Sequence, residues 1–120
     1  MKIAITSEGQ DLQSLVDTRF GRAQWFIVAD LETGEFQAVS NEQNLALPQG
    51  AGIQAAENVA RHLPSYLITG HCGPKAFRAL SAAGIKVILG AEGTVAEVLD
   101  SFRRGDLNPA EGPDVTGHWT

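Results

Sequence analysis

Two arginines that could clamp an anion lie close together in the segment Asp17-Thr18-Arg19-Phe20-Gly21-Arg22. A guanidinium group is planar, always charged and donates several hydrogen bonds, so a pair of them suits a charged ligand. The neighbouring ring could supply an apolar wall, and the glycine allows close approach of the backbone. The same arginines could instead pair with Asp17 and other carboxylates on a solvated surface. The ligand-binding residues predicted in this segment are Arg19, Phe20, Gly21 and Arg22.

A second candidate segment, Thr69-Gly70-His71-Cys72-Gly73-Pro74-Lys75, leads from an expected strand into an expected helix. Proline suits the first helical turn because its missing N–H group costs nothing there. The N–H groups and dipole of a helix start favour an anion, and Lys75 adds a positive charge. Cys72 could also pack as a small apolar side chain, and an exposed His71 could have no role. The residues predicted to bind a ligand here are His71, Cys72, Gly73 and Lys75.

A third segment, residues 44 to 52, also leads into an expected helix and contains Gln49-Gly50-Ala51-Gly52. Two glycines at a helix start can present backbone N–H groups to an anion. The pattern matches neither a Walker motif nor a dinucleotide-binding fingerprint, so it is unspecific when taken alone. We include Gly50 and Gly52 in the predicted site.

The elements that must position these segments alternate between strands and helices. A leading hairpin followed by strand–helix–strand–helix predicts an α/β fold, with a single mixed sheet of about five strands flanked by helices. Helical spacing of apolar residues is clearest after Thr94, which forms a capping-box pair with Glu97. We expect strands at 2–6, 25–30, 35–40, 65–69 and 85–89, and helices at 50–63, 74–83 and 94–103.

Composition limits the class of protein further. The chain has 120 residues, of which 43% are hydrophobic, and this suits one globular domain. Its net charge of −5 argues against a nucleic-acid binder. No apolar run approaches the ~20 residues that span a bilayer, and the start does not resemble a signal peptide, so a cytoplasmic location is expected. We expect a domain over residues 1–105 and a flexible C-terminal tail over 106–120, which contains two prolines and two glycines.

Taken together, the three loop motifs resemble the dinitrogenase iron–molybdenum cofactor biosynthesis family. The resemblance covers about residues 1 to 105 and rests on motifs in the same order. These are Asp17-x-Arg19-Phe20-Gly21-Arg22, Gly50-Ala51-Gly52-Ile53-Gln54-Ala55-Ala56 and Cys72-Gly73-Pro74-Lys75-Ala76-Phe77 followed by Ala82-Ala83-Gly84-Ile85-Lys86-Val87. Within the family, the short chain is most similar to the orange proteins. The resemblance implies a ribonuclease-H-like fold and non-covalent binding of a molybdenum–copper sulfide cluster or an iron–molybdenum–sulfur cluster.

The resemblance predicts a non-catalytic protein that binds, carries or stores an anionic metal–sulfur cluster. Thiolates favour soft metals, so Cys72 could also touch a metal such as copper directly. Expected partners are the cluster and a protein that receives it, without nucleic acid or membrane, and the chain is expected to be a monomer or homodimer. Two alternatives stay open. The loops could dock another protein, or they could act on an anionic substrate with His71 and Cys72 as base and nucleophile.

Overall fold

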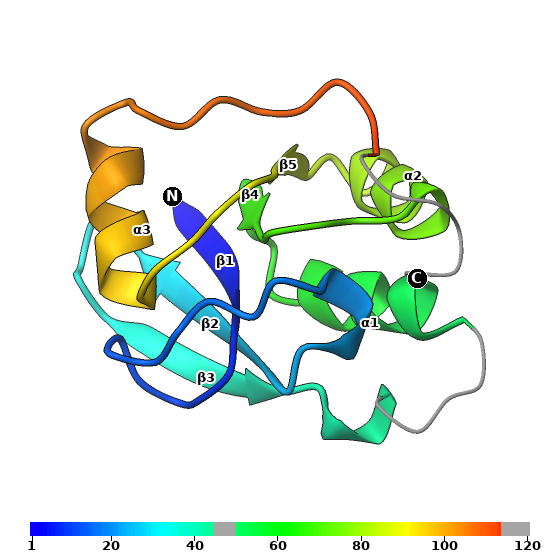
Figure 1. The fold of residues 1–120 in the computed structure, drawn as a ribbon, viewed down its shortest axis with the longest axis horizontal. Coiled ribbons are helices and arrows are strands. Elements are labelled where there is room, and N and C mark those ends of the chain that lie inside the picture. Colours follow the sequence, from blue (N-terminus) through cyan, green and yellow to red (C-terminus); the bar gives the residue numbers. More distant parts are fainter. Residues whose placement is uncertain (45–49, 114–120) are drawn as a thin grey trace.

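A single open sheet forms the centre of the molecule (Figure 1). The computed structural model describes residues 1–44 and 50–113, so part of the third candidate segment (45–49) and the end of the predicted tail (114–120) lie outside the described residues. The strands follow the order β3-β2-β1-β4-β5 across the sheet. Their bounds are β1 Lys2–Ser7, β2 Trp25–Asp30, β3 Phe36–Ser40, β4 Tyr66–Ile68 and β5 Lys86–Ile88.

The sheet is mixed, as the sequence predicted. β1 pairs antiparallel with β2, and β2 pairs antiparallel with β3. β1 pairs parallel with β4, and β4 pairs parallel with β5. This arrangement confirms the predicted ribonuclease-H-like α/β fold. The two parallel strands β4 and β5 are each three residues long and therefore shorter than predicted, because their outer residues pass directly into loops.

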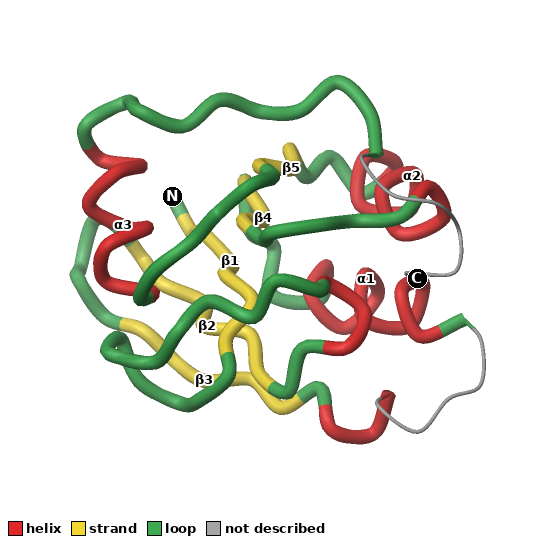
Figure 2. Tube along the Cα trace, viewed as in Figure 1, coloured by secondary structure: helices red, strands yellow, loops and turns green. Residues whose placement is uncertain are grey.

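Helices cover both faces of the sheet (Figures 1 and 2). The described α-helices are α1 Ala51–Ala60, α2 Pro74–Ala82 and α3 Val95–Arg103. α1 and α2 pack on one face, where Val59 and Leu80 join a buried cluster with Leu67 of the sheet. α3 packs on the other face, where its apolar stripe meets the strand isoleucines. In the described part of the chain, no helix is long and apolar enough to span a membrane.

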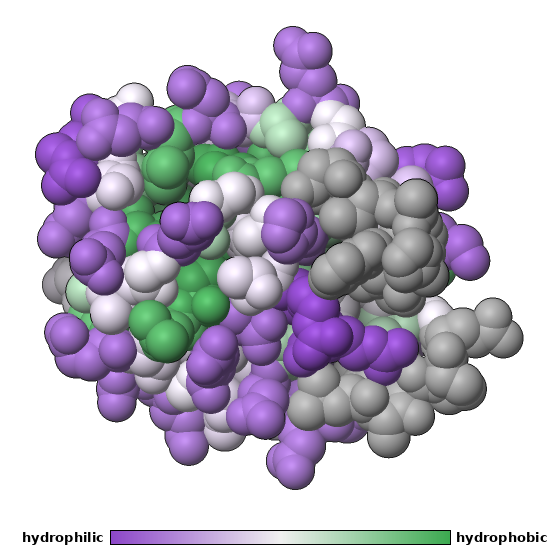
Figure 3. All heavy atoms as spheres, viewed as in Figure 1, coloured by the Kyte–Doolittle hydropathy of each residue, from purple (hydrophilic) through white to green (hydrophobic). Residues whose placement is uncertain are grey.

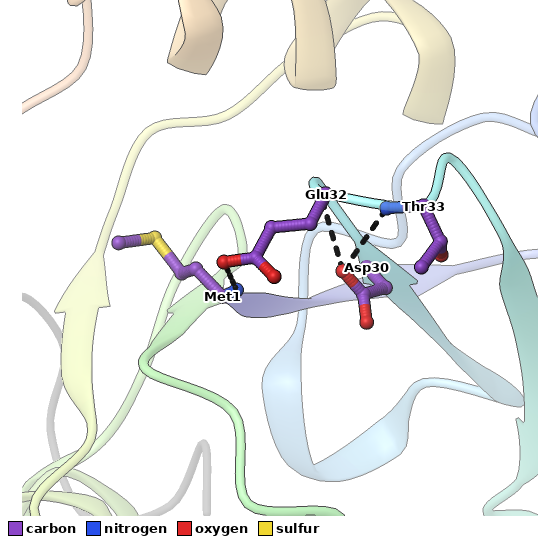
Figure 4. A network of polar contacts seen from close by, with 4 residues as sticks. All are labelled: Met1, Asp30, Glu32 and Thr33. Atoms are coloured by element: carbon purple, nitrogen blue, oxygen red, sulfur yellow. Dashed lines mark hydrogen bonds and ion pairs between the residues drawn. The ribbon is translucent and has the colours of Figure 1, made fainter.

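The β2–β3 hairpin turns at the end of the sheet that is remote from the candidate loops. The Asp30 carboxylate accepts hydrogen bonds from the N–H groups of Glu32 and Thr33 at 2.9 and 3.4 Å (Figure 4). The Met1 ammonium lies 3.5 Å from the Glu32 carboxylate and ties the N-terminus to the same turn. Gly34 adopts a φ of 78°, which favours glycine and explains the predicted Thr33-Gly34 turn.

The first part of the predicted tail contacts the domain. From α3 the chain passes along the edge strand β5 towards α2 (Figure 1). Leu107 packs against the α3 side of the core, and the Ala110 N–H group donates to the Val87 carbonyl at 2.7 Å. An edge strand has outward-facing backbone groups that such a segment can pair with. Leu107 and Ala110 thus attach this segment to the core and to the edge strand.

Candidate anion-binding site

The first two predicted segments and the described end of the third gather at one edge of the sheet. β1, β4 and β5 are parallel, so their carboxyl ends lie on the same side, and β3 runs in the same direction as β1. β1 leads into residues 8–24, β4 leads into residues 69–73, and β3 leads towards the start of α1. Ligands of open α/β sheets commonly bind beyond this edge. The fold thus brings together segments that lie far apart in the sequence.

The arginine segment (residues 17–22) and the glycine-rich segment (residues 69–75) are joined by backbone hydrogen bonds. Arg19 and His71 form an isolated parallel bridge. The His71 N–H group donates to the Thr18 carbonyl at 2.7 Å, and the Phe20 N–H group donates to the His71 carbonyl at 3.2 Å. A Cβ atom added to Gly70 would lie 2.7 Å from the same Thr18 oxygen, so only glycine permits this approach. The two segments form one local structure.

A contact between two glycines attaches the start of α1 to the same unit. Gly21 lies in a short 3-10 helix, η1, which spans Phe20–Arg22. A Cβ atom on Gly21 would lie 3.0 Å from the Gly52 nitrogen and 3.1 Å from its Cα atom. Gly50 precedes the helix with a φ of 79°, a left-handed conformation that side chains disfavour. The predicted glycines therefore serve close backbone packing and a sharp helix entry.

A shallow pocket of about 450 Å³ contains both predicted arginines. Arg19 is exposed and Arg22 is half-buried. On the face drawn in Figure 3, strongly hydrophilic side chains gather in front of α1, where Figure 1 shows the segment before β2. The pocket places two guanidinium groups where an anionic ligand could contact both of them. Its lining residues are Glu8, Asp17, Arg19, Arg22 and Gln24.

Sequence reasoning missed two of these lining residues. Glu8 directly follows β1, and Gln24 directly precedes β2. Because β1 and β2 are antiparallel neighbours, the end of one strand lies beside the start of the next. Their positions at the adjoining ends of two predicted strands could have identified these residues. Their residue types alone gave no such indication.

Asp17 gives the pocket a partly buried carboxylate. Burial raises the pKa of this carboxyl group above its ordinary value of 3.8, and the nearby Glu8 charge raises it further. A hydrogen bond from the Arg19 N–H group, 3.1 Å from Asp17 Oδ1, and the Arg19 charge act in the opposite direction. The pocket is therefore of mixed charge, and its net potential depends on the protonation of Asp17.

The starts of α1 and α2 carry no side-chain cap. Their N-cap residues are Gly50 and Gly73, and neither makes a side-chain hydrogen bond to the first turn. Pro74 occupies the first turn of α2, as predicted, and Lys75 beside it is exposed. The first N–H groups and the positive dipole end of each helix favour an anion at this edge.

Phe20 and Cys72 occupy the core instead of the surface. Each is 1% exposed, and both belong to the cluster beneath α1 and α2. The Phe20 ring lies 5.7 Å from the Phe26 ring, and Cys72 Sγ lies 3.6 Å from the Gly73 carbonyl oxygen. His71, the sequence neighbour of Cys72, is exposed, so the two side chains diverge. Phe20 does not form the expected surface wall, and the geometry gives no support to direct metal contact by Cys72.

Within residues 1–44 and 50–113, no group of three or more His, Cys, Asp or Glu side chains is placed to hold a metal ion. What the edge does supply is guanidinium groups, a lysine and helix starts. These groups recognise the outer atoms of an anion.

Known proteins resemble this chain over nearly its whole length. The family model described as dinitrogenase iron-molybdenum cofactor matches residues 1–105. The apo form of the orange protein from Desulfovibrio gigas is 45% identical, with a TM-score of 0.93 over 95% of this chain and 96% of that one. A putative NifB protein from Thermotoga is 38% identical, with a TM-score of 0.79 over 92% and 98%. An uncharacterized protein of Methanocaldococcus jannaschii is 27% identical over 113 residues, 92% of each chain.

Proposed function

The chain belongs to the dinitrogenase iron-molybdenum cofactor family, and on that premise we propose that it binds and carries an anionic molybdenum-containing metal–sulfur cluster without catalysing a reaction. Family membership and the likeness to the orange protein support a role in cofactor binding or biosynthesis. The proposed cargo is a molybdenum–copper sulfide cluster or one of the iron–molybdenum type. The proposed place of binding is the carboxyl edge of the sheet.

One observation supports the proposal most strongly. Arg19 and Arg22 line the same pocket, and their segment is attached by backbone contacts to the start of α1 and to the loop that leads into α2. Two guanidinium groups and two helix starts thus lie at one edge of a chain whose overall charge is −5. A local concentration of donors decides the binding of a small anion more than the net charge does.

The predicted site residues divide into two roles under this proposal. Arg19, Arg22, His71 and Lys75 reach the surface at least in part and supply polar contacts to the cluster. The backbone of the glycines at the helix starts supplies N–H groups. Phe20, Gly21 and Cys72 are buried and hold the loops in shape.

The test is a visible spectrum with metal analysis of protein kept under anoxic conditions, before and after addition of tetrathiomolybdate and Cu(I). We expect stable charge-transfer bands, with molybdenum and copper retained in a fixed ratio to protein after gel filtration. Bands that accompany iron and molybdenum in freshly purified protein would identify the other cluster type. Protein that stays colourless and retains no metal under each condition would contradict the proposal.

A matched control keeps adventitious copper from counting as support. Cu(I) alone and molybdate alone are added to separate samples of the same protein. The proposal expects neither to reproduce the bands, because both samples lack the sulfide ligands from which the charge-transfer transitions arise. Equal retention of Cu(I) with and without tetrathiomolybdate would show copper binding that is unrelated to the cluster.

A further inference from the structure

Two buried threonines connect the strands beneath the site to the arginine segment. We propose that Thr6 and Thr69 are positioning residues that hold the arginine segment and the glycine-rich segment at a fixed separation, and so set the affinity of the site for its anionic ligand. This inference rests on the proposed function, since it concerns the same site. Thr69 is the first residue of the second candidate segment, but neither Thr69 nor Thr6 was among the residues predicted to bind a ligand.

The two side chains form a relay of hydrogen bonds. Thr6 and Thr69 are both fully buried, and their hydroxyl oxygens lie 2.9 Å apart. The Thr6 hydroxyl also donates to the Asp17 carbonyl at 2.6 Å. A carbonyl oxygen can only accept and a hydroxyl has one proton, so Thr69 must donate to Thr6. The relay therefore runs in one direction, from Thr69 through Thr6 to Asp17.

Backbone hydrogen bonds fix both ends of the relay. The Asp17 N–H group donates to the Thr6 carbonyl at 3.0 Å, which gives Asp17 two attachments to the end of β1. The Thr69 N–H group donates to the Ile88 carbonyl at 3.0 Å, and the Ala91 N–H group donates to the Thr69 carbonyl at 3.1 Å. The relay thus links the carboxyl ends of β1, β4 and β5 to the first residue of the arginine segment.

The relay and the backbone hydrogen bond between Thr18 and His71 together form a closed ring of bonds. From Asp17 the chain continues to Thr18, whose carbonyl accepts from the His71 N–H group. From Thr69 the chain continues through Gly70 to the same His71. Removal of the hydroxyl bridge would leave the two segments held by backbone bonds alone, namely those of Asp17 with Thr6 and of Thr18 and Phe20 with His71. The separation of Arg19 from the start of α2 would then be less constrained.

The location of the pair argues for a role beyond core packing. Ile5 and Ile68 are register partners in β1 and β4, so Thr6 and Thr69 continue the same pairing at the edge where the site lies. Valine has nearly the same shape and would bury no polar group, whereas a buried hydroxyl is costly unless it is hydrogen-bonded. Both buried hydroxyl groups have hydrogen-bond partners, so their desolvation is compensated. They also form a directional link that valine cannot provide.

The test compares hydroxyl removal with a matched loss of packing. Thr6→Val and Thr69→Val remove one hydroxyl each, Thr6→Ser restores it without the methyl group, and Ile5→Val removes one buried methylene beside Thr6. Affinity for tetrathiomolybdate with Cu(I) is measured by absorbance titration, and stability by urea denaturation. Amide hydrogen exchange at Asp17 and His71 is measured on metal-free protein, which makes this readout independent of the ligand.

We expect Thr6→Val to weaken binding about tenfold and to speed exchange at both amides, since it removes a hydrogen bond at each side of the relay. Thr69→Val should give a smaller loss, and Thr6→Ser should bind within about twofold of wild type. Ile5→Val should lose stability while it keeps its affinity.

Several outcomes would overturn the inference. One is wild-type affinity and wild-type exchange in a folded Thr6→Val protein, and another is an equal loss of affinity in Ile5→Val. If both valine variants fail to fold, the hydroxyls are required for folding of the whole domain, and a specific role in positioning the two loops is refuted. A wild-type protein that binds no cluster would contradict the proposed function instead, and the exchange data would still decide whether the relay constrains the loops.

Discussion

The described α-helices begin in two different ways. α3 is capped completely: Thr94 and Glu97 form a capping box, and the next N–H groups donate to carbonyls of the loop after β1. Those bonds join Val95 to Ser14 at 2.9 Å and Ala96 to Leu12 at 2.8 Å. α1 and α2 begin instead at Gly50 and Gly73, which offer no side-chain oxygen.

The difference separates structural helix starts from those available to a ligand. The start of α3 is saturated by the chain's own acceptors and has no need of an anion. The arginine segment contacts Gly52 at the start of α1 and His71 in the loop that leads into α2, and neither helix has a side-chain cap at its positive dipole end. Glycine at both N-cap positions leaves the first turn without an acceptor from the cap side chain.

The largest expected effect follows from adding a side chain where the two loops are in close contact. Gly70→Ala would place a Cβ atom 2.7 Å from the Thr18 carbonyl oxygen and force the loops apart. We expect about 3 kcal/mol lower stability in urea denaturation and loss of cluster binding. Gly34→Ala is the control, because its Cβ atom meets open space and only its φ of 78° is unfavourable. It should cost about 1 kcal/mol and leave binding intact; an equal effect of the two variants would refute the close-approach explanation.

Neutralising the pocket should weaken binding without weakening the fold. Arg19→Gln and Arg22→Gln each remove a charged donor that the proposal assigns to the cluster. We expect about a tenfold loss of affinity for each in an absorbance titration with tetrathiomolybdate and Cu(I). Arg61→Gln, at the C-cap of α1, and Arg78→Gln, in α2, are matched controls at exposed positions. If the control variants lose as much affinity as the pocket variants, the effect reflects general charge and the pocket is not the site.

Removing the α3 cap should lower stability and leave binding unchanged, which is the opposite of the effect expected for the arginine variants. Thr94→Ala deletes the hydroxyl that accepts from the Glu97 N–H group at 3.1 Å, while the backbone N–H group of residue 94 can still donate to the Glu97 carboxylate. We expect about 1 kcal/mol lower stability and unchanged cluster affinity. Thermal or urea denaturation and the same titration measure the two effects. A loss of affinity with little loss of stability would contradict the claim that the start of α3 has only a structural role.

The smallest expected effect concerns the protonation of Asp17. Its pKa is raised by burial, so the carboxyl group becomes neutral as the pH falls through that raised value. The negative charge in the pocket disappears, and affinity for an anion should rise on acidification. Asp17→Asn keeps an oxygen for the Arg19 N–H group and should bind about twofold tighter at neutral pH, with no further gain on acidification. Titrations at several pH values, with Glu35→Gln as a control, would expose a dependence of the wrong sign.

The sequence predicted the elements well because their signals are periodic. The apolar stripe and capping box of α3, the proline in the first turn of α2 and the Thr33-Gly34 turn all occur where expected. The shared edge of the sheet followed from alternating strands and helices. These features depend on local residue order, which a single sequence displays directly.

Side-chain direction within the loops could not be predicted in the same way. A loop has no period that says which residue faces inward. Phe20 was therefore expected to form a wall of the ligand site, and metal contact and core packing both stayed open for Cys72, whereas both residues lie in the core. The bridge between Arg19 and His71 and the bond between Thr6 and Thr69 join residues more than fifty positions apart. Such contacts depend on the three-dimensional register of β1 and β4.

The most direct test of the account is a map of amide chemical shifts in isotopically labelled protein as tetrathiomolybdate and Cu(I) are added, since Cu(I) and Mo(VI) are both diamagnetic. We predict that the largest shifts fall on the amides of Ala51, Gly52, Lys75 and Ala76 and on the segment from Arg19 to Arg22. The amides of Val95, Ala96 and Glu97 should stay in place because their acceptors belong to the chain. Shifts concentrated at the start of α3, or spread evenly over the molecule, would contradict the assignment of the site.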